Sequence, residues 1–240
     1  MTDTARDDFL TAAIDSESAD RLKARGLRLA LVDTSDTDSL AELLRAENRG
    51  FHGSAMDSDT LEFVLPRIAG RRTTGVWDDS AAELATPVST VSIWPTELTV
   101  PGNSSVTAWS IAAVTVAPTH RRLGIARAMI EAELRTAASL GVPVAALTVS
   151  EATIYRRFGF GPAAMIADWT IDTARAAWTG PRSSGRVHFV SPEDLLVDGL
   201  ELVERVRLET PGHMTFGGIL WERLLGFTGG KDAGKHLRVV

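Results

Sequence analysis

Cysteine is absent from this chain of 240 residues, so a disulfide framework, a thiolate metal site and a cysteine nucleophile are all excluded. Long apolar runs are also missing, since no run approaches the roughly 18 residues that a membrane-spanning helix needs. The opening segment, Met1 to Leu10, is acidic and polar, unlike the basic and then apolar start of a secretory signal. These absences predict a cytoplasmic protein that does not enter a membrane.

An excess of basic residues is missing too. Lysine and arginine number 25 against 31 aspartate and glutamate residues, which gives a formal charge of −6. This balance argues against bulk binding of nucleic acid and is compatible with cationic partners. Hydrophobic residues make up 44% of the chain and charged residues 23%, a globular balance that excludes wholesale disorder. At roughly 150 residues per domain, the length predicts one to two domains.

The composition changes along the chain predict three parts. Residues 1–26 are rich in Asp, Ser and Ala and are expected to form a polar N-terminal arm. Residues 27–178 alternate between strand-like and helix-like patterns and are expected to form the main domain. A stretch rich in Gly, Ser and Pro, residues 174–186, reads as a linker. Residues 187–240 then begin again with a strand and are expected to open a second, incomplete domain.

Periodicity predicts a mixed α/β fold. The expected strands are Leu27–Val32, Thr73–Trp77, Pro87–Trp94, Trp109–Val116, Val142–Val149, Met165–Ile171, Val187–Val190 and His236–Val240. The expected helices are one capped by Ser35 or Asp36, then Leu61–Ile68, Arg121–Ser139, Pro192–Leu208 and Ile219–Leu225, with a short helical turn over Ala152–Phe158.

The segment from Val114 to Ala126, V-T-V-A-P-T-H-R-R-L-G-I-A, carries the clearest chemical signal. A strand leads through a basic turn and a glycine into a helix, whose first N–H groups are free and whose dipole is positive. Gly124 leaves room for an anion, and His120 adds charge together with two arginines. The arrangement suits a diphosphate. The alternative is an ordinary helix start with solvated arginines. Neither G-x-G-x-x-G nor G-x-x-x-x-G-K-[ST] is present, which disfavours the dinucleotide and Walker interpretations.

Two motifs resemble a known family. The pattern Arg121-x-x-Gly124-x-Ala126 after an apolar strand resembles motif A of the GNAT N-acetyltransferases. The run S-E-A-T-I-Y-R-R-F-G-F-G-P from Ser150 to Pro162 resembles a signature of the enhanced intracellular survival (Eis-type) acetyltransferases, which the A-P-T-H-R-R-L-G block also fits. The resemblance is dense over residues 114–163 and looser back to Leu27. It implies the GNAT acyl-CoA N-acyltransferase fold, a mixed central sheet flanked by helices.

The resemblance also implies a binding site for acetyl-CoA as co-substrate, between two strands that move apart. Tyr155, the only tyrosine in the chain, then acts as general acid for the departing CoA thiolate, although a core aromatic is the alternative. Ser150 contacts CoA near its thiol. The pantetheine and diphosphate positions that the resemblance implies are Val114, Val116, Arg121, Arg122, Leu123, Gly124, Ile125 and Ala126. The histidines show no metal-ligand spacing, so no metal is assigned.

The predicted function is acetyl transfer from acetyl-CoA to a primary amine, by direct attack in a ternary complex. The acceptor expected is a small cationic molecule, for example one like an aminoglycoside, or lysine. The acidic residues Asp57, Asp59 and Glu62 lie on the expected acceptor side and would attract cationic amines, although solvation of a loop and a helix face is the favoured explanation for each one alone. No nucleic-acid or membrane partner is predicted, and a homo-oligomer stays open.

Three points stay open from the sequence. In the resembling family the general base has been tied to a terminal carboxylate of a distant third domain, and this role cannot be carried over to Val240. Residues 187–240 look like only the opening of a second GNAT-like domain. The alternatives to acetyl transfer are a CoA-binding or regulatory module without turnover and an enzyme for another acyl-CoA.

Overall fold

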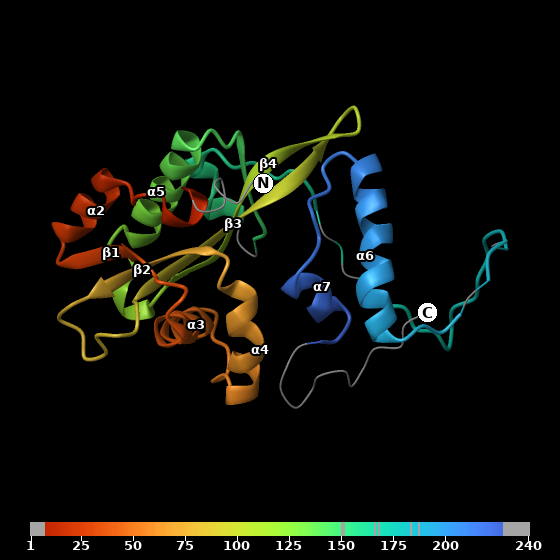
Figure 1. The fold of residues 1–240 in the computed structure, drawn as a ribbon, viewed down its shortest axis with the longest axis horizontal. Coiled ribbons are helices and arrows are strands. Elements are labelled where there is room, and N and C mark those ends of the chain that lie inside the picture. Colours follow the sequence, from red (N-terminus) through yellow and green to blue (C-terminus); the bar gives the residue numbers. More distant parts are fainter. Residues whose placement is uncertain are drawn as a thin grey trace.

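A five-stranded sheet forms the centre of the molecule (Figure 1). The computed structural model describes residues 8–149, 152–165, 167, 169–182, 184–186 and 188–227. The strands lie in chain order and are β1 (Leu27–Leu31), β2 (Arg72–Asp78), β3 (Ser89–Val100), β4 (Ser104–Val116) and β5 (Val144–Leu147). Neighbouring strands are antiparallel, except that β4 and β5 are parallel.

Helices cover both faces of the sheet. Figure 1 shows α2 and α5 together on one face and α3 with α4 on the other. The helices are α2 (Ser16–Lys23), α3 (Thr37–Gly50), α4 (Ser58–Ile68), α5 (Ile125–Ser139), α6 (Pro192–Glu209) and α7 (Ile219–Leu224). Three single 3₁₀ turns are η1 (Pro118–His120), η2 (Ala152–Ile154) and η3 (Arg156–Phe158). The result is a helix–sheet–helix sandwich, which buries both sides of the sheet.

Side-chain oxygens fix where four of these helices begin. Asp15, Asp36, Asp57 and Ser191 each accept a hydrogen bond from a backbone N–H in the first turn of α2, α3, α4 and α6. Such a cap satisfies one of the N–H groups that a helix start leaves unpaired. The predicted cap of the second of these helices is therefore Asp36 rather than Ser35.

The segment before β1, which lies in the polar arm predicted over residues 1–26, contributes side chains to the core. Phe9 is 3% exposed and packs edge to face on Trp109, with ring centroids 5.0 Å apart. Leu22 of α2 is 1% exposed. Arg135 of α5 donates two hydrogen bonds to the Asp15 carboxylate, at 2.9 and 2.7 Å. The composition of the segment is mostly polar, so its few buried apolar residues do not stand out in the sequence. Residues 1–7 lie outside the described residues.

The prediction of a strand at Met165–Ile171 is wrong for the residues described there. Described residues between 161 and 190 form neither strand nor helix, and Met165 and Trp169 are 89% and 86% exposed. A segment with a strand-like pattern becomes a strand only when it can pair with a neighbouring strand and pack its side chains against a surface. His188 to Val190 is likewise not a strand, whereas Val187 and the predicted strand His236–Val240 lie outside the described residues.

The last described segment docks on β3. The ladder between β2 and β3 ends at the pair Arg72 and Ile93, so the following part of β3 has an open edge. Residues 212–215 cover it: Gly212 N donates to Thr99 O at 2.8 Å, and Thr215 N donates to Glu97 O at 2.9 Å. Ile219 of α7 packs into the α3–α4 core. Within the described part of the chain, no helix combines the length and the apolar character needed to cross a bilayer.

Candidate active site

The parallel strands β4 and β5 separate part-way along their length. Their pairing runs from Ala108 with Val144 to Ile111 with Leu147, and β4 continues to Val116 without a strand partner on that side among the described residues. Backbone N–H and C=O groups that lose their strand partner need other partners. A cavity of about 170 Å³ opens at this point. Its lining residues are Phe51, Ile111, Ala112, Ala113, Val114, Leu147, Thr148, Val149, Ile154 and Tyr155.

A β-bulge re-aims β4 beside this cavity. Thr90 of β3 lies opposite Thr115, but Ser92 lies opposite Ala112, so two residues of β4 face Val91 alone. The extra residue gives Ala113 a φ of 55°, which only a bulge or turn requires of alanine. The hydroxyl of Thr90 donates to Ala113 O at 2.7 Å and fixes the kink. The bulge turns Val114 into the cavity wall.

The predicted coenzyme residue Val114 therefore lines the cavity, as does the predicted catalytic residue Tyr155. Val116 is not among the lining residues; it pairs with Ser89 and packs against the larger core. Ser150 lies outside the described residues. Phe51, which follows α3, lines the cavity without having been predicted. Its only signal in the sequence is an aromatic residue between Gly50 and Gly53.

Tyr155 lies between η2 and η3, at the wall of the cavity. Its ring meets that of Phe160 edge to face, with centroids 6.1 Å apart. Burial raises the pKa of the Tyr155 phenol above its ordinary value of 10.0. The phenol therefore keeps its proton at neutral pH and can donate it.

The turn before α5 has the conformation of an open anion site. Arg122 and Gly124 both have positive φ, at 66° and 77°, and α5 begins at Ile125 without a side-chain cap. The first N–H groups of a helix have no acceptor inside the helix. Arg121, Arg122, Leu123 and Gly124 are exposed, whereas Ile125 is buried. A Cβ at Gly124 would meet nothing within 4 Å, so lack of space does not explain the glycine. The left-handed backbone, which L-residues adopt at a cost, favours glycine at this position.

His120 lies beside this turn, and its ring pairs with an acidic residue of β2. Its Nε2 lies 3.0 Å from Asp78 Oδ2 at the end of β2, and its Nδ1 lies 2.8 Å from Thr119 Oγ1. The hydroxyl of Ser80 and the ring of His120 lower the pKa of Asp78 to about 2. Asp78 is then a carboxylate acceptor at neutral pH, so His120 Nε2 carries the hydrogen of this contact.

The acidic residues expected at the acceptor side have structural surroundings. Asp57 caps α4 by accepting from Thr60 N at 2.8 Å. Asp59 accepts from Ser58 Oγ at 3.3 Å, and Glu62 is exposed on α4. None of the three lines the 170 Å³ cavity. In the described part of the chain, no three His, Cys, Asp or Glu side chains are grouped closely enough to hold a metal ion.

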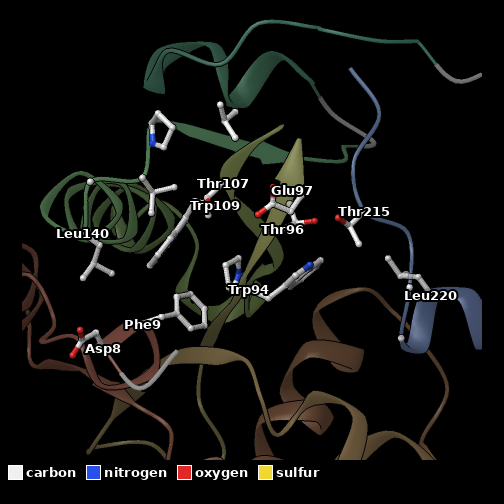
Figure 2. Close-up of a pocket in the computed structure, with 17 residues that line it drawn as sticks. Asp8, Phe9, Trp94, Thr96, Glu97, Thr107, Trp109, Leu140, Thr215 and Leu220 are labelled. Atoms are coloured by element: carbon white, nitrogen blue, oxygen red, sulfur yellow. The ribbon is translucent and has the colours of Figure 1, made fainter. Parts of the chain in front are cut away.

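A larger hollow of about 940 Å³ lies at the opposite ends of β4 and β5 (Figure 2). Figure 2 shows Trp94 on the side of Thr215 and Leu220 of the docked segment, whereas Trp109 lies on the side of Phe9. The hollow contacts β4 at residues 106–109 and the chain before β5 at residues 140–143. Ligands of parallel sheets bind beyond the carboxyl ends of the strands. Val114 lies toward that end of β4, and Tyr155 follows β5 on the same side. The smaller cavity is therefore the candidate active site.

Comparisons with known proteins agree with this geometry. A family model described as an acetyltransferase (GNAT) domain matches residues 32–163. An uncharacterised N-acetyltransferase of Streptomyces avermitilis is 37% identical over 191 residues, covering 76% of this chain and 44% of that protein. The N-acetyltransferase Eis of Mycobacterium bovis is 38% identical over 133 residues, covering 53% of this chain and 33% of that protein.

A solved structure gives the same answer. The crystal structure of Eis1 from Mycobacterium abscessus matches with a TM-score of 0.57 at 26% identity, and covers 82% of this chain and 46% of that one. The chain spans about half the length of the Streptomyces relatives that it matches. The family match covers more than half of the chain, and the strands β2 to β5, the bulge and the helix α5 lie within it. The chain belongs to the GNAT acetyltransferase family.

Proposed function

We propose that this protein transfers the acetyl group of acetyl-CoA to a primary amine. One observation carries the proposal: Val114, beside the bulge of β4, and Tyr155 line one cavity, which opens where β4 and β5 separate. The open N-terminus of α5 follows the same strand. An acyl donor with a diphosphate at one end and a reactive thioester at the other fits this order of features.

The coenzyme is held along β4 in this proposal. Its diphosphate accepts hydrogen bonds from the N–H groups of residues 122–126, and the exposed Arg121 and Arg122 add positive charge. Its pantetheine arm runs between the separated strands, with Ser150 near the thiol. Its amides pair with backbone groups of β4 around Val114, which β5 leaves without a strand partner. Val116 contributes through its backbone alone, because its side chain packs in the core.

The transfer itself is a direct displacement at the thioester. The neutral amine attacks the carbonyl carbon, and the oxygen takes up negative charge that a backbone N–H near Val114 stabilises. The C–S bond then breaks, and the Tyr155 hydroxyl gives its proton to the leaving thiolate. Solvent water is proposed to take the proton of the amine. The described lining residues of the cavity include no carboxylate and no imidazole. Glu151 lies outside the described residues.

The acceptor is proposed to be a small cationic amine or a lysine side chain. The names of the relatives support N-acetyl transfer as the reaction class, and the net charge of −6 favours cationic acceptors. A CoA-binding module without turnover is the alternative function.

Thiol release separates the two functions. The chain has no cysteine, so a thiol reagent reports only the CoA that the reaction frees. We expect release from acetyl-CoA with at least one member of a panel of aminoglycosides, polyamines and lysine peptides. Binding of CoA by calorimetry without thiol release for any amine would favour the binding module. Competition by longer acyl-CoA donors tests the chain length of the acyl group.

A further inference from the structure

The turn between β4 and α5 needs support from outside. Arg122 is a non-glycine residue with a φ of 66°, and Gly124 follows two residues later with a φ of 77°. L-residues adopt this left-handed conformation at a cost in free energy, so it persists only where the surroundings hold it. The conformation also aims the N–H groups that begin α5.

Two side chains from elsewhere in the fold make hydrogen bonds to this turn, one at each end. Arg25 Nη1 donates a hydrogen bond to Leu123 O at 2.8 Å, from 98 residues earlier in the chain. Asp78 Oδ2 accepts from His120 Nε2 at 3.0 Å, and the two side chains are only 20% and 16% exposed. The other ring nitrogen of His120 faces Thr119 Oγ1, so the ring is fixed on both sides.

Arg25 and Asp78 both lie at one end of the strand pair β1 and β2. Leu27 of β1 lies opposite Asp78 of β2 in the antiparallel register. Arg25 precedes Leu27 by two residues, and Gly26 between them turns the chain with a φ of 75°. The side chains of Arg25 and Asp78 therefore both reach the turn from the same end of the β1–β2 pair.

We propose that Arg25 and Asp78 are positioning residues for the coenzyme, which hold the turn of residues 120–124 in the conformation that binds the CoA diphosphate. The inference rests on the proposed function. Neither residue needs to touch the coenzyme. They act by fixing His120 and Leu123, so that binding does not have to select a rare conformation of the turn.

Calorimetry with CoA tests the proposal directly. We expect Arg25→Ala and Asp78→Ala each to weaken CoA binding about tenfold, the loss that one charged hydrogen bond can produce. The neighbouring pair Arg28 and Asp79 provides the matched control, because its side chains meet at 3.4 Å in an exposed contact away from the turn. Arg28→Ala and Asp79→Ala should bind CoA like the wild type.

A shortened donor separates positioning from general damage. Acetyl-pantetheine lacks the diphosphate, so the turn variants should use it with unchanged kcat/KM, while KM for acetyl-CoA rises and its kcat stays. Equal losses with both donors, or wild-type affinity for CoA in both variants, would overturn the proposal. If the wild type itself does not bind CoA, the proposed function fails instead.

A gentler pair of variants covers the case in which the alanine variants do not fold. In His120→Gln the amide nitrogen can occupy the place of Nε2 and bond to Asp78, whereas His120→Asn is too short to reach it. We expect His120→Gln to keep most of the CoA affinity and His120→Asn to lose about tenfold. Equal affinities in the two variants would count against the positioning role.

Discussion

At the scale of single residues, Tyr155 can be tested without changing the shape of the cavity. Tyr155→Phe keeps the ring and its contact with Phe160 and removes only the hydroxyl. We expect kcat to fall about 10²- to 10⁴-fold, the usual loss of a general acid, with CoA affinity unchanged. Steady-state kinetics and calorimetry measure the two quantities. A kcat within twofold of the wild type would remove Tyr155 from the mechanism.

The raised pKa of Tyr155 adds a pH dependence to the same test. Because burial disfavours the phenolate, the proton leaves only above the ordinary value of 10.0. The rate should therefore not fall through loss of this proton anywhere below pH 10.

Gly124 is the second residue whose role can be isolated, because the chain offers a matched partner. Gly124 and Gly141 both have left-handed backbones, with φ of 77° and 70°, and a Cβ on either would meet nothing within 4 Å. They lie at opposite ends of α5. Gly124→Asp and Gly141→Asp should each incur a backbone strain of about 1–2 kcal/mol. In urea unfolding Gly141→Asp should lose more stability, because its carboxylate lies at the negative end of the helix dipole.

Only one of the two variants should affect the coenzyme. Gly124→Asp places a negative charge where the diphosphate binds, so CoA affinity should fall more than tenfold, which is about 1.4 kcal/mol or more. Gly141→Asp should bind CoA normally. Equal affinities in titration calorimetry would place the diphosphate elsewhere.

At the scale of elements, the ion pair between the N-terminal segment and α5 links pH to stability. Arg135 lowers the pKa of Asp15 from 3.8 to about 2, chiefly through its hydrogen bonds. The folded state therefore holds the carboxylate more strongly than the unfolded state does. The resulting stability is complete above pH 4 and is lost as the pH falls toward 2.

The substitution Asp15→Asn measures this contribution. Asparagine can still cap α2, so the variant removes the charge and keeps the cap. Because Arg135 is partly exposed, we expect a loss of only about 1 kcal/mol at pH 7. Urea unfolding should show the wild type and variant converging between pH 4 and pH 2. A gap that persists at pH 2 would mean that packing, not charge, fixes the segment.

Elements that carry their own signals were predicted within a few residues. The helices α6 and α7 were expected at Pro192–Leu208 and Ile219–Leu225, and each has a regular apolar pattern. The sequence predicts the start of α5 four residues too early, because residues 121–124 turn through two left-handed residues, Arg122 and Gly124, before the helix begins. A pattern shows which residues can be buried, and the backbone that precedes a helix is set by its contacts.

In the candidate site, too, some features can be predicted from local motifs and others depend on distant contacts. Val114 and Tyr155 were placed in one site through motifs in the sequence, and they line one cavity. The bulge at Ala113 depends on register with β3 and leaves no local mark. The hydrogen bond between His120 and Asp78 joins residues 42 positions apart in the chain. The hydrogen bond between Arg25 and Leu123 joins residues 98 positions apart. Such contacts depend on the assembled sheet, which no short motif contains.

At the scale of the whole molecule, the docked C-terminal segment bears on the division into domains. The sequence predicts a second unit that begins at residue 187, and this boundary stays a prediction. Several contacts attach the described part of that segment to β3 and to the helices α3 and α4. Residues 212–215 bond to β3, Ile219 enters the α3–α4 core at 6% exposure, and Glu222 pairs with Arg67 of α4. These contacts predict that the segment stays attached after the connection is cut.

Limited trypsin digestion tests this attachment. Arg175 is 88% exposed, and Arg182 and Arg186 are also exposed, so cleavage should begin in this stretch. We expect the two fragments to elute together from a sizing column without denaturant. Ile219→Asp should release the C-terminal fragment, because burying an isoleucine stabilises by about 1.5–3 kcal/mol and burying an unpaired carboxylate costs more. Leu224→Asp is the matched control on the same helix, since Leu224 is 56% exposed. Fragments that separate in the wild type would show that residues 188–227 form a unit apart from the sheet, as the composition of the chain predicts.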